Sequence, residues 1–140
     1  MRYELSVDIN ADAARVWAVL TDVEHWPEWT ASVRRVQRLE SGPLRLGSRT
    51  RVDQPRMRPL VWEVTGLEPD RDLTWTSRTA GVTTVASHRL AAHPDGTVTM
   101  TLGVEQSGAL APLVGLLAGG QTRRYVQLEA QGAKRRSESG

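Results

Sequence analysis

His88 is the residue whose type and position best suit acid–base chemistry. In the segment 84–92, His88 and Leu90 share one parity and Arg89 takes the other. Because Arg89 is expected to face water, alternation along a strand predicts that His88 points inward. An imidazole titrates near neutral pH, so an inward His88 beside an apolar cavity would suit proton transfer on an enolisable ketone.

The alternative for His88 is a core histidine that is hydrogen-bonded to a neighbouring polar group. The sequence assigns no aspartate or glutamate as its orienting partner, so no catalytic triad is predicted. No pair of carboxylates is placed for glycoside hydrolysis, and the serines lack the Gly-x-Ser-x-Gly context of a hydrolase. A glycine-rich phosphate loop is also missing, which argues against nucleotides.

Tyr125 is the second candidate for a catalytic group. It lies one helical turn after Gln121, and both face the sheet if the C-terminal segment is a helix that rests on Leu117 and Leu128. Together they would present a hydroxyl and an amide to a ligand near a cavity entrance. The alternative is a tyrosine packed on the rim of the sheet.

Trp62 and Trp75 are predicted on inward faces of two neighbouring strands. Two indoles that wall a cavity would suit a flat aromatic or polyene ligand, although at least one of them is expected to belong to the core. Trp17, Trp26 and Trp29 are interpreted as structural. The full set of predicted ligand-binding residues is Trp62, Trp75, Ser77, Met100, Gln121 and Met57.

The elements that would position these residues begin with a strand and two short helices. Residues 3–9 alternate apolar and polar side chains, which predicts a half-buried strand. A helix is predicted over 11–21, capped by Asn10 or Asp12, and a helical turn over 22–29 is broken at Pro27. Six strands follow in a meander, because Pro- and Gly-containing turns separate them; they lie near 32–40, 48–54, 60–67, 73–80, 82–92 and 97–105.

A long helix is predicted from Pro112 to about Arg136. Its apolar stripe is expected to cover the dry face of the sheet, with Arg123, Arg124, Glu129 and Lys134 solvated; the stripe comprises Leu113, Leu116, Leu117, Tyr125 and Leu128. The sequence therefore predicts one domain over 1–136, with 137–140 as a frayed tail.

This order of elements resembles the START-like superfamily, the helix-grip or Bet v 1-like fold, and within it the polyketide cyclase/dehydrase branch. The motifs that carry the resemblance are Ala13-Ala14-Arg15-Val16-Trp17, Asp22–Trp29, Trp62-Glu63-Val64, Glu68-Pro69, Leu73-Thr74-Trp75 and Asp95-Gly96-Thr97. It implies an α+β fold in which a curved seven-stranded antiparallel sheet wraps around the C-terminal helix. It also implies a deep apolar cavity between sheet and helix, which relatives use to bind apolar molecules or to cyclise and dehydrate substrates.

Composition excludes several classes of protein. The 140 residues contain no cysteine, so disulfides, cysteine zinc sites and thiol nucleophiles are absent. Three histidines without paired spacing argue against a metal, and no cofactor is expected. The net charge of +2 is too small to indicate nucleic-acid binding, and no stretch predicts membrane insertion, so the cytoplasm is the expected location.

Arginine is concentrated between Arg34 and Arg58, where Arg49 and Arg51 share a strand face. Such a patch is usually a solvated face that protects a sheet edge. The sharper hypothesis is a docking surface for an acyl carrier protein, with electrostatic steering. The exposed aromatic residues that stack on bases are missing from the patch, which disfavours nucleic acid.

Three functions remain open from the sequence. The first is an enzyme that cyclises or dehydrates a polyketide-like or aromatic substrate, and the second is a carrier or sensor of an apolar ligand without chemistry. The third is an interaction module that uses the basic face. The oligomeric state is expected to be monomer or homodimer, since a free edge strand is compatible with either.

Overall fold

The computed structural model describes residues 1–139 of the chain. Its elements follow one another in the order β1 (Arg2–Ile9), α1 (Ala13–Thr21), the 3₁₀ helix η1 (Val23–Glu28), β2 (Arg35–Arg38), β3 (Arg49–Asp53), β4 (Leu60–Glu68), β5 (Asp72–Thr79), β6 (Val82–Ala92), β7 (Val98–Ser107) and α2 (Ala111–Glu138). This confirms the predicted helix-grip fold: two short helices between the first two strands, and a long helix at the end.

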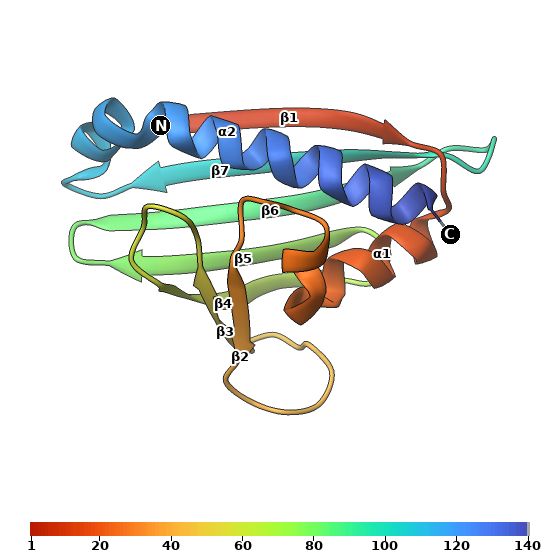
Figure 1. Cartoon of the computed structure of the whole chain (residues 1–140), viewed down its shortest axis with the longest axis horizontal. Coiled ribbons are helices and arrows are strands. Elements are labelled where there is room, and N and C mark those ends of the chain that lie inside the picture. The colour runs from red at the N-terminus through yellow and green to blue at the C-terminus, as the bar shows by residue number, and fades with distance from the viewer. Residues whose placement is uncertain (140) are drawn as a thin grey trace.

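The seven strands form one antiparallel sheet in the order β1-β7-β6-β5-β4-β3-β2. The first strand pairs with the last, and every other pairing joins neighbours in sequence, as short turns require. The sheet is strongly twisted, so that β2 and β3 run at a steep angle to β6 and β7 (Figure 1). The resulting concave face is the one that the helices cover.

Local sequence explains the two short helices. The side chain of Asp12 accepts a hydrogen bond of 2.8 Å from the backbone N–H of Arg15, which caps α1 at its N-terminus. Pro27 lies inside η1, and the chain leaves the helical conformation two residues later at Trp29. The indole N–H of Trp26 donates to the carbonyl of Leu20, which fixes η1 against the end of α1.

Helix α2 lies along the concave face beside β1 and β7, and its C-terminal half packs against α1 (Figure 1). The face that it buries is made of small residues, namely Gly119, Val126, Ala130, Gly132, Ala133 and Ser137. The predicted leucine stripe is wrong at its start, because Leu113, Leu116 and Leu117 are 51%, 81% and 77% exposed. They lie on other sides of the helix from the small residues that let its backbone approach the core.

The end of α2 is better anchored than the sequence indicates. The helix ends at Glu138 and Ser137 is buried, so α2 extends two residues past the boundary predicted at residue 136. The carboxylate of Glu138 accepts hydrogen bonds from the backbone N–H of Asn10 and from Lys134. Of the predicted frayed tail, Gly140 lies outside the described residues.

Candidate active site

His88 lies at the centre of the sheet and makes two hydrogen bonds. Its Nδ1 lies 2.8 Å from the carbonyl oxygen of Leu73, on the neighbouring strand β5. Its Nε2 lies 2.7 Å from Oε1 of Glu129, which reaches down from α2. The His88 side chain is 3% exposed and that of Glu129 is 17% exposed, so water reaches the carboxylate and hardly reaches the ring.

The hydrogen-bond partners determine how the proton is held. A carbonyl oxygen only accepts, so Nδ1 of His88 must carry a hydrogen that it donates to Leu73. A bond from Nε2 to the ionised carboxylate of Glu129 requires a second proton on the ring, as in an imidazolium. Burial is the largest single effect on the pKa of His88 and lowers it, but the charge and hydrogen bond of Glu129, with the Leu73 carbonyl, outweigh it and raise that pKa above the ordinary value.

Aromatic rings enclose the histidine. The ring of Trp26 lies 5.5 Å from that of His88, and the ring of Trp75 lies 6.1 Å away, both roughly edge to face. Trp75 also packs against Trp26 and Trp62, with centroids 5.2 and 5.7 Å away. These indoles exclude water from the His88 ring, and the low polarity around the ring strengthens its attraction to the Glu129 carboxylate. Trp26, interpreted from the sequence as a structural residue that could line the cavity mouth, is part of the cavity wall.

Glu129 is the functional residue that sequence reasoning missed, because it was predicted to be solvated. It lines an apolar cavity of about 100 Å³ between the sheet and α2. The signal was present in the helical spacing, since Glu129 follows Gln121 and Tyr125 at intervals of four residues and shares their side of the helix. His88 has the partner that the sequence could not assign.

The cavity is bounded by residues from seven elements and two loops. Its walls are apolar around the middle and polar toward the mouth; they are formed by Trp26, Val33, Val52, Gln54, Met57, Leu60, Trp62, Trp75, Thr84, Ala86, Val104, Gln106, Thr122, Tyr125, Val126 and Glu129. A volume of about 100 Å³ is smaller than that of typical pockets for small molecules, which measure about 300–1,000 Å³. In this conformation the cavity has room for little more than one small ring.

The predicted ligand-binding residues are placed at different depths. Trp62, Trp75 and Met57 line the cavity. Met100 is fully buried on β7, and neither it nor Ser77, which is 3% exposed on β5, belongs to the cavity wall among residues 1–139. Both lie at register positions of the concave face, as alternation predicts.

Tyr125 lines the cavity at its mouth, and Gln121, one helical turn earlier, does not belong to the cavity wall among residues 1–139. The hydroxyl of Tyr125 donates to the carbonyl of Pro55, in the loop between β3 and β4. The side-chain amide of Gln121 donates to the Tyr125 oxygen at 2.9 Å and to the Pro55 carbonyl at 3.3 Å. These contacts connect α2 to the loop, so the structure gives both side chains a partner within the protein.

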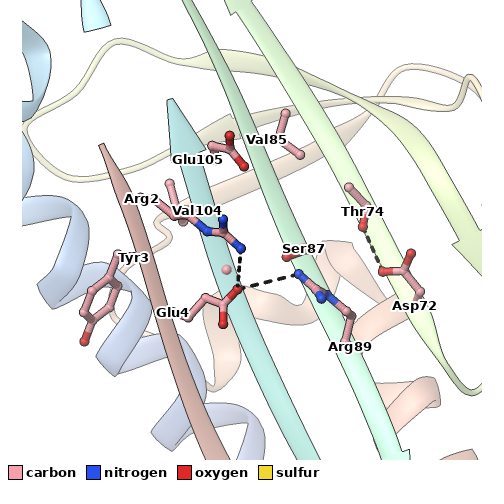
Figure 2. Close-up of a pocket in the computed structure, with 11 residues that line it drawn as sticks. Arg2, Tyr3, Glu4, Asp72, Thr74, Val85, Ser87, Arg89, Val104 and Glu105 are labelled. Atoms are coloured by element: carbon pink, nitrogen blue, oxygen red, sulfur yellow. Dashed lines mark hydrogen bonds and ion pairs between the residues drawn. The ribbon is translucent and has the colours of Figure 1, made fainter. Parts of the chain in front are cut away.

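A larger hollow of about 410 Å³ lies on the outer face of the sheet, above Gly103. Figure 2 shows charged side chains standing around it, with the carboxylate of Glu4 between Arg2 and Arg89. The side chains of Arg2, Glu4 and Arg89 are 70%, 43% and 58% exposed, and Glu4 pairs with both arginines. Solvent therefore screens their charges. The hollow is a gap between exposed side chains, and the enclosed cavity is the better candidate for a site.

The arginine-rich segment is partly neutralised by neighbouring acids. Arg34 lies 3.8 Å from Asp53, and Arg38 lies 3.4 Å from Glu40. Arg49 faces Glu63 across β3 and β4. The charge of this face is therefore smaller than the sequence indicates.

The described residues were compared with the requirements of a metal site and of a membrane-spanning helix. No cluster of three or more histidines, aspartates or glutamates able to hold a metal occurs in the described part of the chain. In the same residues, no helix is long and apolar enough to cross a membrane.

Comparison with protein families identifies the chain by its sequence. Residues 1–138 match the family model described as polyketide cyclase / dehydrase and lipid transport. The chain belongs to this family. No curated protein matches the sequence.

Solved structures of the same fold share little sequence with the chain. A hypothetical protein from Helicobacter pylori aligns with a TM-score of 0.80 at 17% identity, over 97% of this chain and 86% of that one. A START superfamily protein from Mycobacterium smegmatis gives 0.74 at 14% identity, over 96% and 97%. The Zhui aromatase/cyclase from a Streptomyces species gives 0.70 at 19% identity, over 99% and 92%. These likenesses establish the START-like fold.

Proposed function

We propose that the protein is an enzyme that binds an aromatic, polyketide-like ketone in the cavity and catalyses proton transfer on it, the step common to cyclisation and dehydration. The observation that carries the proposal is the position of Glu129. Its carboxylate lines the apolar cavity and is held by a buried imidazolium behind it. A carrier of apolar molecules needs the cavity but has no use for a desolvated acid–base pair in its wall.

The chemistry follows from the two carboxylate oxygens. Oε1 of Glu129 is bonded to His88, and Oε2 makes no hydrogen bond within residues 1–139, so Oε2 is available to a substrate. Glu129 removes the α-proton of the ketone, and the electrons of the C–H bond form the enolate. The pair is then an imidazolium beside a neutral carboxylic acid, with one proton more than before and a net positive charge that stabilises the negative enolate nearby. Glu129 is thus the catalytic base, and His88 is its positioning residue.

The second half of the reaction returns the proton. In a dehydration, the protonated pair gives its extra proton to the β-hydroxyl, the C–O bond breaks, and water leaves with formation of the double bond. In a cyclisation, the enolate carbon attacks a second carbonyl, and the resulting alkoxide takes the proton. Either route returns the extra proton and restores the imidazolium–carboxylate pair, so the reaction needs no oxidant or reductant.

The mouth must open for such a substrate to enter. We assign Tyr125, which the sequence offers as a catalytic group, to this opening, because its hydroxyl is bonded to the Pro55 carbonyl. Met57 stands in the same loop with 38% of its surface exposed. Movement of the loop away from α2 would enlarge the cavity toward the size that two or three fused rings need.

The test uses 2-tetralone, a two-ring ketone with acidic α-protons. Exchange of these protons with D₂O is followed by NMR with the wild-type protein, with Glu129→Gln and without protein. We expect the wild type to accelerate exchange and Glu129→Gln to lose the acceleration by about 100-fold or more while still binding the ketone. Glu63→Gln, which changes a carboxylate that does not line this cavity, is the control and should behave like the wild type.

The outcome also separates the alternatives. Binding of 2-tetralone without accelerated exchange would contradict the enzyme and support a carrier or sensor of apolar ligands. The third alternative, an interaction module, requires a cavity filled by side chains and an unpaired basic face. Side chains leave the cavity unfilled, and acids lie beside Arg34, Arg38 and Arg49. Both observations disfavour an interaction module.

A further inference from the structure

A row of polar side chains crosses the concave face at the mouth end of the cavity. Ser77 of β5 faces Thr84 of β6, and Thr84 faces Gln106 of β7. The rows nearer the floor differ in character. The next one is Trp75, Ala86 and Val104, which is apolar, and the one after it contains His88 between Leu73 and Leu102.

Two atoms of this row are buried without a partner. Oε1 of Gln106 and Oγ of Ser77 make no hydrogen bond to any of residues 1–139. Native proteins pair nearly all of their buried polar atoms, so two buried atoms without a hydrogen-bond partner in one row require an explanation. Thr84 and Gln106 line the cavity, and Ser77 is beside Thr84 in the same row. Thr122, on the opposite wall, is different, because its hydroxyl donates to the Ala118 carbonyl of its own helix.

We propose that Gln106 is a specificity-determining residue that binds a hydroxyl group of the ligand, with Thr84 beside it as a second donor and acceptor. This inference rests on the proposed function, since it concerns the same cavity. An amide oxygen only accepts hydrogen bonds, so the group that satisfies Gln106 must be a donor. On an aromatic, polyketide-like molecule that donor is a phenolic hydroxyl.

The spacing of the rows sets the length of the ligand. Thr84 and His88 are four residues apart on β6, which corresponds to about 13 Å along a strand. On α2, Thr122 and Glu129 are seven residues apart, or about 10 Å. A ligand that reaches both ends therefore has at least two fused rings, with its hydroxyl at the mouth and its acidic C–H at the floor. The apolar row and the two indoles contact the rings between them.

The experiment compares two probes of nearly equal shape, 2-naphthol and 2-methylnaphthalene, in which a methyl group replaces the hydroxyl. Their dissociation constants are measured by quenching of the indole fluorescence of Trp62 and Trp75. We expect the wild type to prefer 2-naphthol by about tenfold, the contribution of one well-placed hydrogen bond. Gln106→Leu should bind both probes equally, with the affinity for 2-methylnaphthalene unchanged or higher.

Thr122→Val is the matched control, because it removes a cavity-lining hydroxyl that is already satisfied. It should keep the preference of the wild type. Equal affinity of the wild type for the two probes, or a preference that survives Gln106→Leu, would overturn the inference while leaving the proposed function standing. Binding of neither probe would overturn both, since the cavity would then not accept aromatic rings.

Stability of the ligand-free protein gives a second readout. A buried glutamine oxygen without a hydrogen-bond partner destabilises the ligand-free protein. Gln106→Leu should therefore raise the melting temperature, and the same variant should lose the preference for 2-naphthol. A glutamine with a purely structural role would give the opposite sign, a lower melting temperature with an unchanged preference.

Discussion

Nε2 of His88 and Oε1 of Glu129 lie 2.7 Å apart although 41 residues separate them in the chain. One belongs to the centre of the sheet and the other to the helix that covers it. The contact exists only when α2 is docked, so folding itself assembles the acid–base pair. The two sides of the pair also differ in access, since the ring is enclosed by indoles while the carboxylate reaches the cavity.

Glu129→Gln should lower the pKa of His88. Without the carboxylate, burial is the dominant effect, and it disfavours the charged ring. We expect the NMR titration of the His88 ring nitrogens to have its midpoint above about 6.5 in the wild type and below it in the variant. Asp22→Asn is the control, because Asp22 raises the pKa of exposed His25 and does not contact His88. A His88 titration that is the same in wild type and Glu129→Gln would contradict the ion pair.

The raised pKa of His88 also predicts how stability depends on pH. A group whose folded-state pKa exceeds its unfolded value binds its proton more tightly in the native state, so it stabilises the fold fully below about pH 6.5. That stability is lost as the pH rises through the folded-state pKa, by about 1.4 kcal/mol for each unit of the shift. Urea unfolding of wild type and Glu129→Gln should show a difference in free energy that shrinks with rising pH. A constant difference would contradict the coupling.

Replacement of both partners should cost less stability than replacement of Glu129 alone. Glu129→Leu leaves Nε2 of a buried ring without a partner, at a cost of about 1–3 kcal/mol. His88→Leu/Glu129→Leu removes both polar groups, and buried pairs replaced by apolar residues are often as stable as the original. We expect the double variant to be more stable than Glu129→Leu in chemical denaturation and inactive in the exchange assay. A double variant that is less stable than Glu129→Leu would contradict this account, because removal of His88 would then carry a cost of its own that does not depend on Glu129.

The sequence was sufficient for the architecture because the signals for strands and turns are local. Period-two segments such as β7 and the proline- and glycine-containing turns predict a meander, and short connections leave few topologies. Alternation also placed His88, Trp62 and Trp75 on the concave face correctly, since the side-chain direction in a strand depends only on parity.

The partner of His88 was not predictable in the same way, because it depends on how α2 is rotated about its axis. The leucines near its start are the most apolar residues of the helix and suggest the wrong buried face. The helix instead buries glycine and alanine, which allows a close approach and turns Glu129 toward the cavity. The lack of a hydrogen-bond partner for Oε1 of Gln106 could not be predicted either, because the burial of a single atom depends on how the whole chain packs.

Tyr125→Phe should loosen the mouth of the cavity. It removes the hydroxyl that donates to the Pro55 carbonyl and accepts from Gln121, which costs about 0.5–1.5 kcal/mol of stability. We expect 2-naphthol to bind and dissociate several-fold faster in stopped-flow fluorescence, with a smaller change in affinity. Tyr3→Phe, at the other tyrosine of the chain, should leave both rates unchanged. If the rates of Tyr125→Phe match those of the wild type, the contact with Pro55 does not limit entry.

Two glycines of α2 test whether the close approach of the helix positions the site. Alanine normally stabilises a helix interior by about 1 kcal/mol relative to glycine. Gly120 is exposed with open space around it, so Gly120→Ala should raise the free energy of unfolding. A Cβ atom on Gly132 would overlap the carbonyl oxygen of Trp29 and lie 2.9 Å from its ring, so Gly132→Ala must push the helix away from the core. We expect it to destabilise the protein despite the better propensity and to lower the pKa of His88, because Glu129 moves with the helix. Gains of similar size in both variants would show that α2 is free to adjust without disturbing the pair.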